Sequence, residues 1–187
     1  KALKIDGAEA TAENIKAGTY KVSRPFNVAM KEDADNEVAK DFLNFILSKE
    51  GQEVITDNGY IPLDDVKAFE GTKPSGKAVI GGSSSVSPVM EKLIEAYKEL
   101  NPNAELELQT TDSTTGMTST IDGSYDIGMA SRELKDTELS GGLEASVIAT
   151  DGIAVIVNKS NPIDDMTSEQ VKNIYVGNAL TWDEVTK

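Results

Sequence analysis

Short apolar segments alternate with segments of predicted helix through the second half of the chain. The apolar segments lie at residues 78–80, 104–109, 125–130, 147–149 and 153–157, and the predicted helices at 88–100 and 113–121. Parallel strands need a crossover of a dozen or more residues, usually a helix, so this alternation predicts a mixed, mostly parallel α/β sheet flanked by helices. Ligands of such sheets bind beyond the carboxyl ends of the strands. The loops that follow the predicted strands are therefore the candidate functional segments.

The first half of the chain is predicted to contain two strands and three helices. Its elements are strands at 2–5 and 20–30, a short helix from Thr11 to Gly18, a helix at 35–47, and a helix that Ser48 caps and Asn58-Gly59 ends. Within 35–47 the apolar side chains recur at intervals of three and four, which predicts a largely buried helix. The polar stretch 64–76 contains Gly and Pro and has no sustained periodicity, so it predicts a linker.

Composition excludes several kinds of chemistry. The chain contains neither histidine nor cysteine, and 18 basic against 32 acidic side chains give a formal charge of −14. Zinc fingers, thiolate nucleophiles and Ser-His-Asp triads each need a missing side chain. The negative charge, without a basic cluster, disfavours nucleic acid. Adjacent carboxylates such as Asp64-Asp65 fit solvated turns better than an acid and base pair. We therefore predict a binding protein, not an enzyme, with no cofactor or metal.

Hydroxyl side chains follow two of the predicted strands. Gly81 and Gly82 lead into Ser83, Ser84 and Ser85 just before a helix, and eight of the eleven residues at 110–120 carry hydroxyls. Glycines allow close backbone approach, serines donate hydrogen bonds, and a helix start has unpaired N–H groups with partial positive charge. Together these groups predict an anion site that needs no cationic side chain. The alternative is that the serines only cap helices.

A third strand ends near the same edge of the predicted sheet. Residues 126–130 lead directly into Ser131 and Arg132. We expect Arg132 either to take part in the anion site or to form a surface ion pair with Glu133, Asp136 or Glu138.

These motifs, taken in order, resemble a known family. Gly-Gly-Ser-Ser-Ser-Val-Ser-Pro at 81–88, Asp-Ser-Thr-Thr-Gly at 112–116, Tyr-Asp-Ile-Gly-Met-Ala-Ser-Arg-Glu-Leu at 125–134 and the apolar segment at 150–162 resemble the phosphate-binding components of bacterial ABC phosphate importers. The resemblance implies a type II periplasmic-binding-protein-like fold in which two α/β lobes close on phosphate. Its implied partners are inorganic phosphate and the importer's membrane subunits.

The resemblance also assigns residues. It implies phosphate contacts from Ser84 and Ser85 in the first loop, Ser113 in the second and Ser131 in the third, with Ser83, Thr114 and Arg132 behind them. Many relatives carry, at the Ser131 position, an aspartate that accepts a hydrogen bond from protonated phosphate. Serine at this position predicts altered discrimination between phosphate and sulfate.

Residues 1–62 resemble the C-terminal part of the same family, although here they come first. The implied organisation has a C-terminal segment at 1–63, a linker at 64–76 and an N-terminal segment at 77–187. The first segment consists of a second-lobe stub at 1–29 and first-lobe helices at 30–63. The last consists of the first lobe at 77–150, followed by the crossover and the start of the second lobe at 151–187. A tandem duplication or a circular permutation gives this order. The family's other lobe supplies an arginine and a Ser-Gly-Thr loop that this chain lacks, so we expect weak or absent phosphate binding by the chain alone.

Location and assembly give further expectations. No run of about 18 apolar residues exists and Lys1 to Lys4 lack a signal peptide's apolar region, so the chain is expected to be soluble as given. The resemblance implies an extracytoplasmic protein of the cell surface or periplasm, such as a lipoprotein whose signal and anchor lie outside this sequence. Two alternatives stay open. The chain is an incomplete lobe that self-associates or exchanges domains, for example as a homodimer through the second-lobe stubs. Alternatively, the site binds a different small oxyanion.

Overall fold

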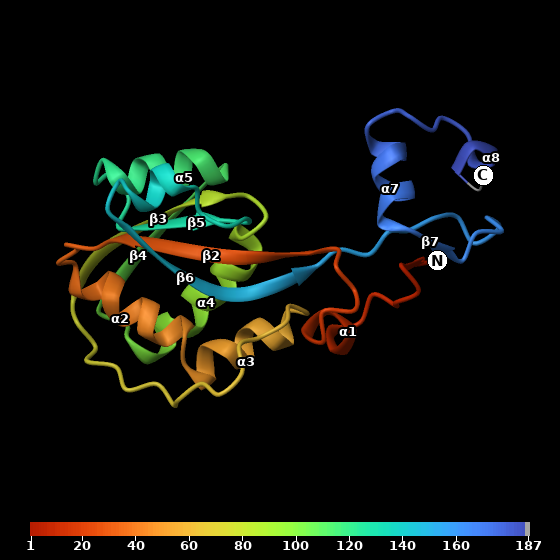
Figure 1. Cartoon of the computed structure of the whole chain (residues 1–187). Coiled ribbons are helices and arrows are strands. Elements are labelled where there is room, and N and C mark those ends of the chain that lie inside the picture. The colour runs from red at the N-terminus through yellow and green to blue at the C-terminus, as the bar shows by residue number, and fades with distance from the viewer. Residues whose placement is uncertain (186–187) are drawn as a thin grey trace. The chain divides into compact units, whose positions relative to one another are not determined.

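The computed structural model describes residues 1–185 and divides into two compact units (Figure 1). The large unit comprises residues 24–151. The small unit comprises residues 1–23 together with the described residues from 152 onward. The chain therefore passes from one unit to the other twice.

A five-stranded mixed sheet forms the centre of the large unit, as the sequence predicts. Its order is β4-β3-β5-β2-β6, with β2 at Ser23–Lys31, β3 at Gly76–Ser83, β4 at Ala104–Thr111, β5 at Ile127–Ala130 and β6 at Leu143–Gly152. Strand β3 runs parallel to β4 and β5, whereas β2 is antiparallel to β5. The register pairs Ser83 with Thr111 and Gly82 with Met129. The carboxyl ends of the three parallel strands therefore meet at one edge of the sheet.

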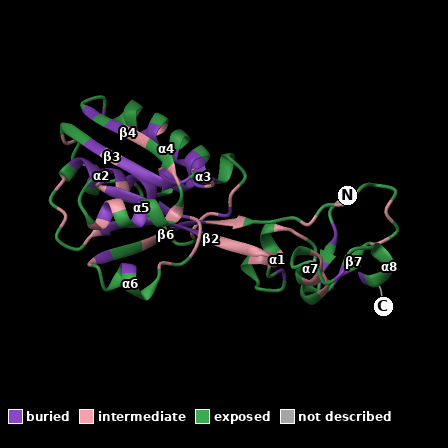
Figure 2. Ribbon diagram, turned by 90° about the horizontal axis from the view of Figure 1, so that it is seen from above, coloured by how far each residue is buried: buried purple, intermediate pink, exposed green. Residues whose placement is uncertain are grey.

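Helices cover both faces of this sheet. They are α2 at Glu37–Ile46, α3 at Lys49–Asp57, α4 at Ser87–Leu100, α5 at Ser113–Ile121 and the short α6 at Asp136–Leu139. In Figure 1, α2, α3 and α4 lie on one face and α5 lies on the other. The core on the first face contains Phe26, Phe42 and Ile80, while Met117 of α5 packs in a smaller cluster with Ala29 and other residues. Figure 2 shows buried residues along β3 and on the helices that cover the sheet, and all four residues of β5 are buried.

The helix boundaries follow local capping chemistry. Asn36 accepts hydrogen bonds from the N–H groups of Val38 and Ala39, so α2 begins at Glu37, two residues after the predicted start at residue 35. Ser48 caps α3, as predicted, and Gly59 follows that helix with a left-handed φ of +83°.

The predicted linker at 64–76 contains no helix or strand except at Gly76, where β3 begins, and it is fixed to the helices of the large unit. The N–H of Phe69 donates to Glu50 Oε2 at 2.7 Å, and that of Thr72 donates to Asp41 Oδ1 at 2.8 Å. The Phe69 ring also makes edge contacts with Phe45 and Tyr97. These contacts make the stretch part of the folded unit and not a mobile connection.

Tyr97 gives the large unit a predicted loss of stability at high pH. Burial, with the Asp41 carboxylate 2.7 Å from the hydroxyl, raises the pKa of Tyr97 to about 12. A tyrosine in the unfolded chain has a pKa of about 10. The folded state keeps the Tyr97 proton to a higher pH than the unfolded chain does. The stabilisation that this hydroxyl gives to the folded state is therefore fully present below pH 10 and is lost between about pH 10 and 12. Urea unfolding at pH 9 and pH 11 is therefore expected to show a larger decrease for the wild type than for Tyr97→Phe.

The exposed Tyr175, which keeps 83% of its surface accessible, supplies the control variant Tyr175→Phe. Equal pH dependence in wild type and Tyr97→Phe would show that the buried hydroxyl does not cause the loss.

The small unit has less regular structure. Its elements are β1 at Lys4–Ile5 and β7 at Asp165–Met166, which pair in parallel, and helices α1 at Ala12–Lys16, α7 at Ser168–Tyr175 and α8 at Trp182–Val185. Leu3, Ile5, Tyr20 and Met166 form the centre of its core. Thr11 caps α1, which agrees with the predicted helix start.

Two details differ from the sequence prediction. Residues 153–157 were predicted to form a strand, but β6 ends at Gly152 and only an isolated bridge joins Ile156 to Ala2. Ile156 is 74% exposed, so an apolar run does not here mean a buried strand. The boundary predicted at 29/30 also differs, because β2 continues through it and pairs Asn27 with Ala130 inside the large unit.

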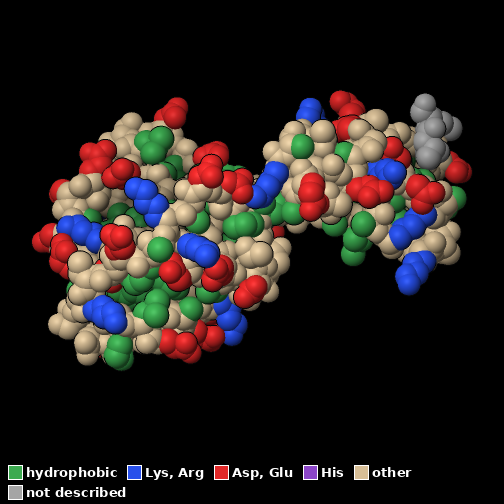
Figure 3. All heavy atoms as spheres, turned by 90° about the horizontal axis from the view of Figure 1, so that it is seen from below, with side chains coloured by type: hydrophobic (Ala, Val, Ile, Leu, Met, Phe, Trp, Pro, Cys, Tyr) green, Lys and Arg blue, Asp and Glu red, His purple; other side chains and the backbone are tan. Residues whose placement is uncertain are grey.

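The surface charges are mixed. On the face that Figure 3 presents, Lys and Arg side chains are scattered among Asp and Glu. Among the described residues, no helix combines the length and apolar character needed to cross a bilayer.

Candidate functional site

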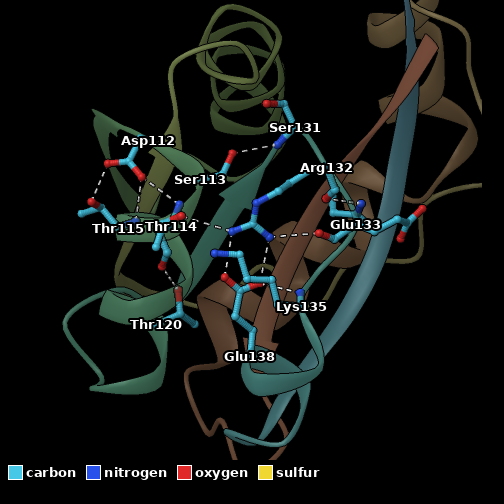
Figure 4. Close-up of polar contacts among 12 residues, drawn as sticks. Asp112, Ser113, Thr114, Thr115, Thr120, Ser131, Arg132, Glu133, Lys135 and Glu138 are labelled. Atoms are coloured by element: carbon cyan, nitrogen blue, oxygen red, sulfur yellow. Dashed lines mark hydrogen bonds and ion pairs between the residues drawn. The ribbon is translucent and has the colours of Figure 1, made fainter. Parts of the chain in front are cut away.

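Backbone contacts join the three hydroxyl-bearing loops at the carboxyl edge of the sheet. The N–H of Ser84 donates to the carbonyl of Thr111 at 3.1 Å, which joins the first loop to the second. The N–H of Ser131 donates to Ser113 Oγ at 3.2 Å, which joins the third loop to the second (Figure 4). Strand order β4-β3-β5 makes these contacts possible, since the three loops leave neighbouring strands.

The contact with Ser131 uses one acceptor position of the Ser113 hydroxyl. A serine oxygen has two lone pairs and one proton. Because Ser113 Oγ accepts the Ser131 N–H, its own proton points elsewhere and is available to a ligand. Ser113 and Ser131 are both half-buried, a degree of exposure that allows a small molecule to reach them. This arrangement presents a hydrogen-bond donor without any formal charge.

The serines of the first loop lie at different depths. Ser84 is exposed and Ser85 is half-buried, whereas Ser83 is only 3% exposed. The carbonyl of Ser83 accepts the N–H of Val86 at 3.0 Å and the hydroxyl of Ser87 at 3.3 Å. Ser83 therefore supports the loop from below, and Ser84 and Ser85 are the residues that a ligand at the edge can reach.

The two helices that start at this edge differ in their caps. Helix α4 spans 14 residues, and no side chain of the described residues caps its start at Val86. Helix α5 is capped by Asp112, whose Oδ1 accepts the N–H groups of Thr114 at 2.8 Å and Thr115 at 3.1 Å. A hydrogen bond from the Thr115 hydroxyl lowers the pKa of the Asp112 carboxyl. The start of α4 thus has no side-chain cap among the described residues, while two of the amides at the start of α5 are already used.

Arg132 forms an ion pair at the back of the site. Its Nη1 lies 2.9 Å from Glu138 Oε2 and its Nη2 lies 2.8 Å from Glu138 Oε1, a two-pronged contact. Nη2 also donates to Thr114 Oγ1 at 3.4 Å. The Arg132 guanidinium holds the pKa of the Glu138 carboxyl below its usual range. Of the three predicted ion-pair partners, the structure selects Glu138, and it also places Arg132 beside the second loop.

One further residue of the site was missed in the sequence. Asn27 of β2 is 1% exposed, and its side-chain amide donates to the carbonyl of Arg132 at 3.0 Å. This bond holds the backbone of the third loop against the sheet. A separation of 105 residues between donor and acceptor leaves no local sequence signal for it.

Glycines allow the strands and α5 to approach closely here. A Cβ placed on Gly82 would lie 2.4 Å from the carbonyl oxygen of Met129, and one on Gly116 would lie 2.8 Å from Gly82 Cα. Gly82 also has a φ of +134°, which side-chain-bearing residues rarely adopt. Gly82 of the predicted glycine pair thus lets β3 approach β5 and α5, and the approach of this loop to an anion stays a prediction.

Other features of the described residues lie away from this edge. They include no group of His, Cys, Asp or Glu suited to a metal ion. A separate cavity of about 340 Å³ is lined by Lys31, Asp33, Asp35 and Asp126 among others, and three carboxylates give it an acidic lining.

Comparison with known proteins gives a consistent family. Residues 67–187 match the model of a PBP superfamily domain. A protein of Streptococcus agalactiae named phosphate-binding protein PstS 2 is 57% identical over 187 residues, which are all of this chain and 64% of that protein. The chain thus spans about two thirds of the length of this curated relative.

Two solved structures extend the comparison. The phosphate-binding protein of a phosphate ABC transporter from Streptococcus pneumoniae is 38% identical, and the match covers 99% of this chain and 72% of that one with a TM-score of 0.90. A putative phosphate ABC transporter substrate-binding protein from Clostridium perfringens, solved with bound phosphate, is 42% identical over 59% of this chain and 46% of its own, with a TM-score of 0.54. The chain therefore belongs to the PBP superfamily, in the family of the phosphate-binding proteins of bacterial ABC phosphate transporters.

Proposed function

We propose that this chain forms the larger part of an extracytoplasmic solute-binding protein that captures inorganic phosphate for an ABC importer and does not transform it. The observation that carries the proposal is the hydrogen bond from the Ser131 N–H to Ser113 Oγ, which joins two hydroxyl-bearing loops at the edge and leaves the Ser113 proton to donate to a ligand. Ser84, Ser85 and the start of α4 supply further donors on the neighbouring loop. The name of the streptococcal relative and the phosphate bound to the clostridial one support the choice of ligand.

The negative net charge does not oppose such a ligand. Oriented N–H and O–H dipoles set the potential at a small site, whatever the charge of the whole surface. A site of neutral donors binds a small oxyanion and still repels large polyanions, which need extended basic surfaces.

Calorimetry tests the proposal. A full-length protein that contains this chain is expected to release or absorb heat on titration with phosphate and to saturate at one site. Absence of phosphate binding in a protein shown to be folded by circular dichroism would refute the proposal. The 187-residue chain, tested beside it, is expected to bind weakly or not at all, and a micromolar constant for the monomeric chain would contradict that expectation.

Ser113→Ala is expected to weaken phosphate binding by roughly ten- to a hundredfold in the full-length protein, the loss associated with one hydrogen bond to a charged group. Thr118→Ala supplies the control, because Thr118 lies on the same helix with an exposed side chain. Both variants are measured by the same titration. Equal affinities for the two variants would exclude Ser113 as a phosphate ligand.

We also propose that the chain has a circularly permuted order relative to other members of the family. The S. agalactiae relative aligns with all 187 residues, whereas the clostridial structure matches only 59% of this chain. Because 187 residues are 64% of the S. agalactiae protein, that protein has about 290 residues. The clostridial chain has about 240, since 59% of 187 residues are 46% of it. A length of about 290 is too short for two such units, which favours permutation over tandem duplication.

The homodimer stays a prediction. The small unit exposes several large apolar side chains, among them Ile156 at 74%, Leu180 at 83% and Trp182 at 47%. Exposed apolar surface of this kind favours association with another surface. Light scattering of the 187-residue chain at several concentrations tests the prediction, and a monomer at all of them would contradict it.

A further inference from the structure

Arg132, which follows Ser131 of the proposed anion site, is paired with a buried carboxylate. Arg132 follows Ser131 directly, and its guanidinium lies beside Thr114 at the start of α5 (Figure 4). Both terminal nitrogens of this guanidinium contact Glu138, whose side chain is only 9% exposed. An arginine beside an oxyanion site would ordinarily bind the anion in the same two-pronged way. Here the carboxylate of Glu138 already holds that position.

Three contacts hold Glu138 in place. Besides the two bonds from Arg132, Glu138 Oε2 accepts the N–H of Lys135 at 2.8 Å, which fixes the start of α6. On the opposite side, buried Asn27 holds the carbonyl of Arg132. Hydrogen bonds therefore fix both the backbone and the guanidinium of Arg132. The ion pair with Glu138 is part of the folded structure of the third loop.

We propose that Glu138 is a specificity-determining residue of the phosphate site: by neutralising Arg132, it makes the site recognise its anion through neutral donors. The inference rests on the proposed function. Glu138 does not touch the ligand in this account, and it acts only through Arg132.

The chemistry of the donors explains the gain in specificity. A serine hydroxyl can both donate and accept a hydrogen bond, whereas a guanidinium only donates. Phosphate near neutral pH carries a proton that it can donate to a hydroxyl oxygen, while sulfate carries none. An unpaired arginine would attract both dianions equally through charge. Neutralising Arg132 therefore keeps the recognition dependent on the ligand's own proton.

Glu138→Gln tests this role in the full-length protein that contains the chain. Glutamine keeps the size and one acceptor oxygen but leaves the charge of Arg132 uncompensated. We expect sulfate to bind at least about tenfold more tightly than to the wild type, the size of one charge-assisted hydrogen bond. The gain is expected to shrink between 50 and 500 mM sodium chloride, because salt partly screens a charge that is 30% exposed. Calorimetric titrations with sulfate and with phosphate measure both effects.

Two further variants separate specificity from general effects. Glu133→Gln removes the same charge from the neighbouring exposed residue and is expected to change sulfate affinity less than about twofold. The double variant Arg132→Gln/Glu138→Gln removes the cation again and is expected to restore the wild-type preference for phosphate. A loss of stability alone does not produce this gain and reversal.

The outcomes distinguish this inference from the proposed function. If the wild type does not bind phosphate, the proposed function fails and the inference falls with it. If the wild type binds phosphate but Glu138→Gln leaves sulfate affinity unchanged, or weakens both anions alike, only the inference fails. A wild type that binds sulfate as tightly as phosphate also overturns the inference.

Discussion

Gly82→Ala is expected to destabilise the large unit by about 3 kcal/mol, among the largest effects of a single substitution in this chain. The new Cβ would lie 2.4 Å from the carbonyl oxygen of Met129 and 2.9 Å from its nitrogen, and both are backbone atoms that no side-chain rotation can move away. The residue would also have to keep a φ of +134°. Relief of this clash must separate β3 from β5, where the first and third loops begin.

Gly123→Ala is the matched control for this prediction. Gly123 also has a positive φ, +84°, but no atom lies within 4 Å of a Cβ placed there. Its substitution is expected to cost about 1 kcal/mol from backbone strain alone. Urea unfolding followed by circular dichroism measures both variants, and an equal loss for the two would contradict the close packing of β3 and β5. In the full-length protein, Gly82→Ala is also expected to weaken phosphate binding, whereas Gly123→Ala is not.

Asp41→Ala is expected to destabilise the large unit by a comparable amount, about 3 kcal/mol, because it leaves buried partners unpaired. Asp41 of α2 is 3% exposed and accepts the Tyr97 hydroxyl at 2.7 Å and the Thr72 N–H at 2.8 Å. Its loss would leave that hydroxyl without its carboxylate acceptor inside the core. It would also release the polar stretch 64–75 from the helices.

Two measurements test this second prediction. Urea unfolding gives the loss of stability, and limited proteolysis is expected to cut the variant within 64–75 faster than the wild type. Glu37→Ala supplies the control, since Glu37 lies on the same helix and forms only an exposed ion pair with Lys40. That variant is expected to change stability by less than about 1 kcal/mol. If Asp41→Ala behaves like Glu37→Ala, the buried network does not hold the stretch in place.

Much of the fold was predictable because its signals are local. The alternation of strands and helices predicts the parallel arrangement of β3, β4 and β5, and the Ser48 cap and Gly59 mark the ends of α3. The juxtaposition of Ser113 and Ser131 also follows from the sequence, since both residues come directly after parallel strands.

The remaining features depend on contacts between distant segments. No local sequence pattern marks Asn27 as the residue that holds the Arg132 carbonyl. None marks Glu138, among several acidic residues, as the ion-pair partner of Arg132. Both contacts depend on where Arg132 lies in the folded chain. The packing of 64–75 likewise depends on contacts with residues distant in the sequence, Glu50 and Asp41. The predicted strand at 153–157 was wrong because an apolar run does not reveal whether its pairing forms a continuous ladder, and here only the bridge between Ile156 and Ala2 forms.

The most direct measurement is the map of amide chemical shifts that phosphate changes in the ¹H–¹⁵N spectrum of the full-length protein that contains this chain. If the edge formed by β3, β4 and β5 is the phosphate site, the largest changes within the chain fall at the amides of Ser84, Ser85, Ser113 and Ser131. Changes confined to the acidic cavity near Lys31 and Asp126, or no saturable change at the edge, would contradict the account.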